Sequence, residues 1–184
     1  PRTEHVMAKA TADCRGAEAP LVQAWALCRA GRADEALTIA TTVHAAARAS
    51  QDAALECRSA TDIAWYCLQI GIPDQGLQHA WAAADIAHDR GDAAADAKAR
   101  ALKAWLLTEV GITEDAVDEA IRALRLAEPA GDAEVLGLAL NVMGVVLWTC
   151  RQPDRAIDFC GRAVAVAPEA GDPVVLDGWR INLG

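Results

Sequence analysis

The side chains that most often carry catalysis or bind metals are few in this chain and widely spaced. The four histidines are His5, His44, His79 and His88, and none lies at zinc-ligand spacing from two cysteines. The six cysteines form no C-x-x-C pair; they are Cys14, Cys28, Cys57, Cys67, Cys150 and Cys160. An even cysteine count is compatible with disulfides, but we expect buried free thiols, because free cysteine commonly packs as a small hydrophobe. We predict no metal site and no cofactor.

Acidic residues are abundant but their placement indicates structure. The pairs Asp34/Glu35 and Glu114/Asp115 fall at the expected starts of helices, where carboxylates favour the positive end of the helix dipole. The stretch GDAAADAKAR, from Gly91, has a single glycine and lacks the spacing of a phosphate-binding loop. We find no catalytic residues and expect this chain to be non-catalytic, although a longer parent chain could carry an enzymatic output domain.

The charge balance excludes two classes of partner. The chain of 184 residues has a net charge of −9 and shows no run of Lys or Arg. Nucleic-acid binders need a basic patch, so we expect no nucleic-acid partner. We expect no membrane contact either, because anionic lipid surfaces disfavour an acidic chain and no apolar run reaches membrane-spanning length. A cytoplasmic location follows as an expectation.

Two short motifs recur with a constant step of 40 residues. The first is GRADEAL at Gly31, GIPDQGL at Gly71, GITEDAV at Gly111 and RQPDRAI at Arg151. The second is QDAA at Gln51, GDAA at Gly91, GDAE at Gly131 and GDPV at Gly171. Periods of about 20 to 50 residues are typical of solenoids, in which each unit buries its apolar face on its neighbours.

Each period is predicted to hold two helices. The first type spans about 52–70, 92–110 and 132–150, and an Asp at its start can cap the helix. The second type spans about 33–49, 73–90, 113–128 and 153–167. Pro73 and Pro153 open two helices of the second type, where a missing N–H costs least.

Small residues share register positions along these helices. One such column is Ala24, Ala64, Ala104 and Gly144, and another is Ala36, Gly76, Ala116 and Ala156. Small side chains let helix axes approach closely. Together with the G-x-x-[DE]-x-[AG]-[LVI] hinge, these columns resemble tetratricopeptide repeats. The resemblance implies an all-α, right-handed superhelical solenoid of antiparallel helix pairs.

The resemblance covers 17–184, as four units and a partial fifth: about 17–56, 57–96, 97–136, 137–176 and 177–184. The unit is longer than the usual length of about 34 residues, and Arg151 replaces a hinge glycine. HEAT-type repeats are the alternative fold. Residues 1–16 are expected to form an N-terminal helix or cap. We expect the chain to be a fragment of a longer one, with an open C-terminal end through which two copies could associate.

The resemblance also implies a concave groove lined by the first helices, with a protein or peptide as its partner. The groove residues carried over from the resemblance are Trp25, Trp65, Trp105, Trp148, Arg58, Lys98, Thr61 and Asn141. Tryptophan suits an anchoring role at an interface, and Arg58 and Lys98 would add positive charge. In the alternative interpretation, the tryptophan rings pack on each other and fill the inside of a tight superhelix.

Lengthened repeats of this kind resemble the sensory or regulatory parts of bacterial signalling proteins, such as diguanylate cyclases. A non-catalytic binding module in such a protein is therefore the expected function. The alternative is a stand-alone scaffold or assembly factor that holds a peptide in its groove.

Overall fold

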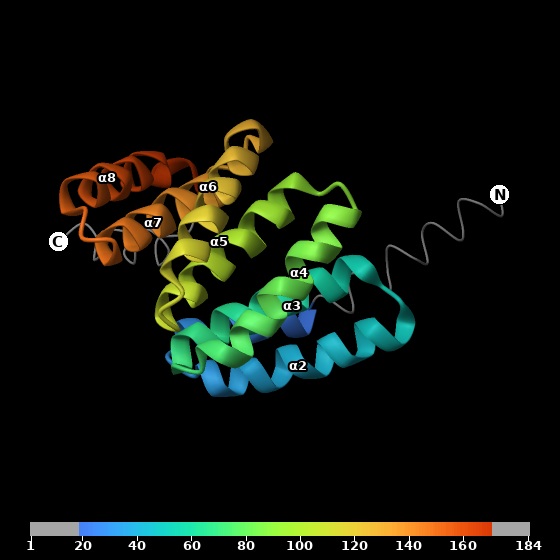
Figure 1. Ribbon diagram of the computed structural model, residues 1–184. Coiled ribbons are helices and arrows are strands. Elements are labelled where there is room, and N and C mark those ends of the chain that lie inside the picture. Colours follow the sequence, from blue (N-terminus) through green and yellow to red (C-terminus); the bar gives the residue numbers. More distant parts are fainter. Residues whose placement is uncertain (1–18, 171–184) are drawn as a thin grey trace.

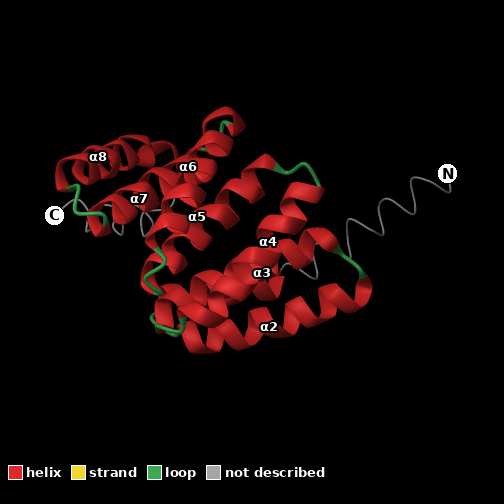
Figure 2. Cartoon of the chain, viewed as in Figure 1, coloured by secondary structure: helices red, strands yellow, loops and turns green. Residues whose placement is uncertain are grey.

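The computed structural model describes residues 19–170, which fold into a right-handed stack of antiparallel helix pairs (Figure 1). After helical residues 19–29 come α2 (Ala33–Ser50), α3 (Ala53–Ile70), α4 (Pro73–Asp89), α5 (Ala93–Glu109), α6 (Thr113–Ala130), α7 (Ala133–Thr149) and α8 (Pro153–Ala170). No strand interrupts this range, as Figure 2 shows. The predicted all-α solenoid is confirmed. The expected helix or cap at 1–16 and the partial fifth unit lie outside the described residues.

The predicted caps account for where the first-type helices begin. The side chains of Asp52, Asp92 and Asp132 accept hydrogen bonds from backbone N–H groups of the turn that follows, at Leu55, Ala95 and Val135 respectively. Each cap occupies a donor that the helix itself leaves without a partner. The helices therefore start one residue after each aspartate, at Ala53, Ala93 and Ala133.

The hinges between helices contain residues with a left-handed backbone conformation. Gly71 and Gly111 have φ angles of 75° and 82°, which glycine adopts without steric cost. Arg151, which replaces glycine in the fourth hinge, still has a φ of 57°. The repeat geometry therefore imposes the same turn on an arginine. Helix α6 continues through Pro129 and ends at Ala130, two residues beyond its predicted end, because the left-handed Gly131 terminates it.

Two layers run along the stack. Residues 19–29, α3, α5 and α7 form the first layer, in which α5 contacts both α3 and α7 directly. Helices α2, α4, α6 and α8 pack against them as the second layer (Figure 1). The core is a series of alanine-rich clusters distributed along the stack, as the alanine columns predict.

The described cysteines are free thiols. Cys57, Cys67 and Cys160 are buried, as expected, whereas Cys28 and Cys150 are only half-buried. Burial raises the pKa of Cys67 to about 11, which keeps it in the protonated, unreactive form. Within residues 19–170, no helix combines the length and apolar character needed to cross a bilayer.

Candidate functional site

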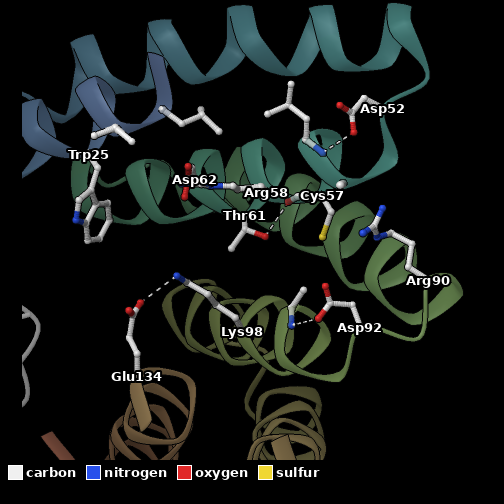
Figure 3. A pocket seen from close by; sticks show the side chains of 15 residues that line it. Trp25, Asp52, Cys57, Arg58, Thr61, Asp62, Arg90, Asp92, Lys98 and Glu134 are labelled. Atoms are coloured by element: carbon white, nitrogen blue, oxygen red, sulfur yellow. Dashed lines mark hydrogen bonds and ion pairs between the residues drawn. The ribbon is translucent and has the colours of Figure 1, made fainter. Parts of the chain in front are cut away.

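A cleft of about 540 Å³ opens on the first layer of helices. Its walls come from residues 19–29, from the N-terminal parts of α3, α5 and α7, and from the turns that precede α3 and α5 (Figure 3). One end is apolar, with Leu21, Val22 and Trp25. The remaining lining mixes further apolar side chains, such as Leu55, with charges of both signs from Asp52, Arg58, Asp62, Arg90, Asp92, Lys98 and Glu134. The cleft can therefore hold a ligand that combines an apolar group with charged ones.

Some of the polar lining is already engaged within the fold. Asp52 and Asp92 cap α3 and α5 through hydrogen bonds of 3.1 Å to the backbone N–H groups of Leu55 and Ala95. The Thr61 hydroxyl donates to the Cys57 carbonyl at 2.9 Å, and only 6% of Thr61 is exposed. These groups shape the cleft wall, and their main hydrogen bonds are made inside the protein.

One ion pair crosses the cleft from α5 to α7. Lys98 Nζ lies 3.2 Å from Glu134 Oε1, and the side chains are 38% and 42% exposed. Solvated pairs of this kind are worth about 0–1 kcal/mol. An anionic ligand can therefore compete with Glu134 for Lys98 at little cost.

Asp62 is the most perturbed acid of the cleft. It follows Arg58 by one helical turn, so both side chains project from the same face of α3 (Figure 3). Burial raises the pKa of Asp62 to about 6, against the opposing charges of Lys98 and Arg58, which lower it. Tyr66, on the next turn of α3, has its pKa raised by burial and by the charge of Asp62. The carboxylate is therefore poorly solvated and only partly compensated.

Four of the eight residues predicted for the groove line this cleft. They are Trp25, Arg58, Thr61 and Lys98, whereas Trp65, Trp105, Asn141 and Trp148 lie elsewhere. Asn141 is 1% exposed, so it is a core residue of α7 and presents no surface to a partner. Trp148 is 65% exposed near the C-terminal end of α7. The cleft therefore brings together half of the predicted groove residues.

Three tryptophans form a ladder of ring contacts across successive units. The ring centroids of Trp25 and Trp65 are 6.1 Å apart, and those of Trp65 and Trp105 are also 6.1 Å apart. All three are half-buried, and Trp65 and Trp105 pack against core clusters. The packing interpretation thus describes Trp65 and Trp105, while Trp25 both packs on the ladder and lines the cleft.

Asp62, Arg90 and Glu134 are among the charged cleft residues that the sequence reasoning missed. A signal was present for Asp62, because the 40-residue step aligns it with Val22, Leu102 and Val142. Leu102 and Val142 are buried to 1% and 0% exposure. A carboxylate in an otherwise apolar column marks this unit as different from its neighbours.

A second polar cluster lies between α5 and α6, away from the cleft. Glu119 accepts ion pairs from Arg100 at 3.0 Å, Lys103 at 3.1 Å and Arg122 at 3.2 Å. Arg100 also binds Asp96 at 2.7 Å, and Lys103 Nζ sits 3.1 Å from the centroid of the Trp81 ring. The charges of this cluster pair with one another, so the cluster links α5 to α6 as a structural element.

Two histidines of the second layer, His44 and His79, pack against each other. The rings of His44 and His79 meet edge to face with centroids 5.3 Å apart, and His44 Nδ1 lies 3.1 Å from Ser59 Oγ. Within residues 19–170, no three His, Cys, Asp or Glu side chains gather closely enough to hold a metal ion.

Comparison with known proteins identifies the fold. Neither the family models nor the curated proteins yield a match to this sequence. Among solved structures, a Rap protein complexed with Competence and Sporulation Factor superposes with a TM-score of 0.79 at 15% identity, over 89% of this chain. The chain spans 46% of that protein, or about half its length.

Two further structures agree. BtubC from P. vanneervenii has a TM-score of 0.68 at 20% identity, over 98% of this chain and 76% of its own. A signal transduction ATPase from Pyrococcus horikoshii with a tetratricopeptide repeat sensor has a TM-score of 0.67 at 16% identity, over 91% of this chain and 25% of its own. The chain therefore has a tetratricopeptide-like solenoid fold.

Proposed function

We propose that this chain is a non-catalytic module that binds a protein or peptide segment in the cleft of its first helix layer. The observation that carries the proposal is the presence of apolar surface, at Val22 and Trp25, in the same cleft as the cations Arg58 and Lys98. Successive units contribute these groups, so an extended ligand would contact several of them at once. The Rap protein with a similar fold is complexed with Competence and Sporulation Factor, which supports a ligand of this kind.

The ligand that fits this lining is a short peptide with a carboxylate next to an apolar side chain. Arg58 and Lys98 would hold the carboxylate through charge-assisted hydrogen bonds, which are stronger than neutral ones. The indole of Trp25 would cover the apolar side chain.

A peptide selection tests the cleft directly. Random heptapeptides displayed on phage are selected on the wild-type chain alone, and the recovered peptides are then measured on the wild type and on an Arg58→Glu/Lys98→Glu double variant. We expect rhodamine-labelled peptides from this selection to bind the double variant at least about tenfold more weakly, because hydrogen bonds to charged groups are worth about 1.5–3 kcal/mol. The measurement is fluorescence anisotropy at pH 7.5.

The matched control is Arg125→Glu, which reverses an exposed charge on α6 outside the cleft. Circular dichroism spectra of each variant are compared with the wild-type spectrum to check that the helices are retained. Peptides that bind the double variant as tightly as the wild type would place the binding surface elsewhere and refute the cleft.

We further propose that the module is the sensory or regulatory part of a larger bacterial signalling protein, such as a diguanylate cyclase. The tetratricopeptide repeat sensor of the Pyrococcus horikoshii ATPase supports a sensory use of this fold. Sequencing the gene on both sides of this segment tests the idea. A cyclase, kinase or DNA-binding domain would support it, whereas repeats alone would favour a scaffold that holds its partner without an output domain.

A further inference from the structure

We propose that Asp62 is an internal competitor of the ligand, which occupies Arg58 and Lys98 when ionised and releases them to a ligand carboxylate when protonated. The proposal deepens the proposed function and rests on it, because it concerns the regulation of the same cleft. It predicts that the cleft binds carboxylate-bearing peptides more tightly in mildly acidic solution.

The first support is that the fold does not need a carboxylate at this place. The register position of Asp62 is filled by Leu102 and Val142 in the next two units, and both are buried apolar side chains. An apolar residue would satisfy the packing, whereas burying a carboxylate costs free energy unless it is paired. The acidic residue therefore serves something other than packing.

The second support is the set of ionisable groups around Asp62. Arg58 and Tyr66 lie on α3 with it, Lys98 reaches in from α5, Glu134 from α7, and Cys28 from helical residues 19–29. Lys98 and Arg58 favour the ionised form of Asp62, and Glu134 disfavours it. Figure 3 shows Arg58 beside Asp62, with Lys98 directed towards Glu134. Asp62 thus lies within the electrostatic influence of the two cations that a ligand carboxylate needs, while Lys98 makes its ion pair with Glu134.

The direction of the pH effect follows from this arrangement. Burial holds the pKa of Asp62 at about 6, above its usual range. Above pH 6 the carboxylate is ionised, attracts the two cations and repels a second carboxylate. Below pH 6 it is protonated, so both cations can turn to the ligand, whose own carboxylate stays ionised because its ordinary pKa is about 4.

The size of the effect has an upper limit. A pKa of about 6 leaves roughly 3% of Asp62 protonated at pH 7.5 and about three quarters protonated at pH 5.5. If the peptide binds only the protonated form, its Kd falls by about 25-fold between these two pH values, because the apparent Kd scales inversely with the competent fraction.

The test uses a histidine-free, rhodamine-labelled heptapeptide recovered in the selection described above. Its Kd is measured at pH 7.5 and at pH 5.5 for the wild type, for Asp62→Asn, and for Asp118→Asn, which alters an exposed acid on α6. We expect the wild type and Asp118→Asn to bind about 5- to 25-fold more tightly at pH 5.5. Asp62→Asn should bind tightly at both pH values.

A wild-type affinity that is the same at both pH values, or a pH dependence that persists in Asp62→Asn, would overturn the proposal. The proposed function would still stand if Arg58→Glu/Lys98→Glu abolished binding. Should the double variant bind normally, the function and this inference would both fall.

Proton uptake gives a second readout that needs no variant. Titration calorimetry of the same peptide into the wild type at pH 6.5, in two buffers of different ionisation enthalpy, reports the protons taken up on binding. We expect uptake of a substantial fraction of one proton. Zero uptake, or release of protons, would contradict the competition.

Discussion

At the scale of single residues, the most demanding interaction is the ion cluster around Glu119. Glu119 is 6% exposed and Lys103 is 4% exposed, so both charges are removed from water. The positive charge of Lys103 is compensated by the Glu119 carboxylate and by the face of the Trp81 ring. Removing one partner of a buried pair leaves the other charge uncompensated, which costs more than the intact pair contributes.

We therefore expect Glu119→Gln to lower the free energy of unfolding by about 3–5 kcal/mol, the range for breaking a buried ion pair. Urea denaturation followed by circular dichroism measures it. The neighbouring Asp118→Asn is the control, because Asp118 is exposed and should change stability by less than about 0.5 kcal/mol. Equal effects of the two variants would mean that the cluster contributes nothing specific.

At the scale of helix pairs, small residues set how closely the two layers approach. A Cβ atom built on Gly76 of α4 would lie 2.8 Å from the Cys67 Cβ of α3 and 3.0 Å from a Leu106 methyl of α5. A Cβ atom on Gly144 would lie within 2.4 Å of the Cys160 sulfur. Gly161 of α8, in contrast, has open space where its Cβ would be. The helix contacts therefore require glycine at some positions of the repeat and not at others.

Gly76→Ala and Gly161→Ala form a matched pair, because their expected effects on protein stability are opposite in sign. Gly76→Ala should destabilise the protein by about 1–3 kcal/mol, because overpacking forces the helices apart. Gly161→Ala should stabilise it by up to about 1 kcal/mol, the difference in helix propensity between the two residues. Thermal unfolding of both variants checks the pair. A Gly76→Ala variant at least as stable as the wild type would show that the layers adjust without cost.

At the scale of the whole molecule, stability comes from contacts between neighbouring units, since a solenoid has no single centre. The tryptophan ladder is one such contact, and Trp65 is its middle member. Its ring meets Trp25 in the preceding unit and Trp105 in the following one. Trp148 ends the next first-layer helix with 65% of its surface exposed. Tryptophan thus occurs in the same layer both as a packed residue between units and as an exposed residue near a helix end.

We expect Trp65→Ala to lower the free energy of unfolding by about 2–4 kcal/mol, somewhat less than for a fully buried tryptophan. Trp148→Ala should change it by less than about 0.5 kcal/mol. Chemical denaturation gives both values. Because Trp65 does not line the cleft, the selected peptides should keep their affinity for any folded Trp65→Ala protein. Similar losses of stability in the Trp65 and Trp148 variants would argue against the ladder as a contact that stabilises neighbouring units.

Much of the fold could be predicted from the sequence because its signals are local and repeat in register. The 40-residue step, the capping aspartates and the hinge glycines located the helices to within a few residues. The alanine columns predicted a core of closely packed helices. Half of the predicted groove residues line the cleft for the same reason, since Arg58 and Lys98 occupy equivalent positions in successive units.

The sequence by itself determined the repeat, the helix ends and the face that each residue occupies, because these depend on neighbours within a few turns. The tertiary structure decided which residues on that face meet solvent. Asn141 and Trp148 belong to the same predicted layer, yet one is buried and the other is exposed. The environment of Asp62 likewise depends on Lys98 and Glu134 from two other units. The burial of a side chain and its charge partners depend on segments that are far apart in the sequence, and only the folded chain brings these segments together.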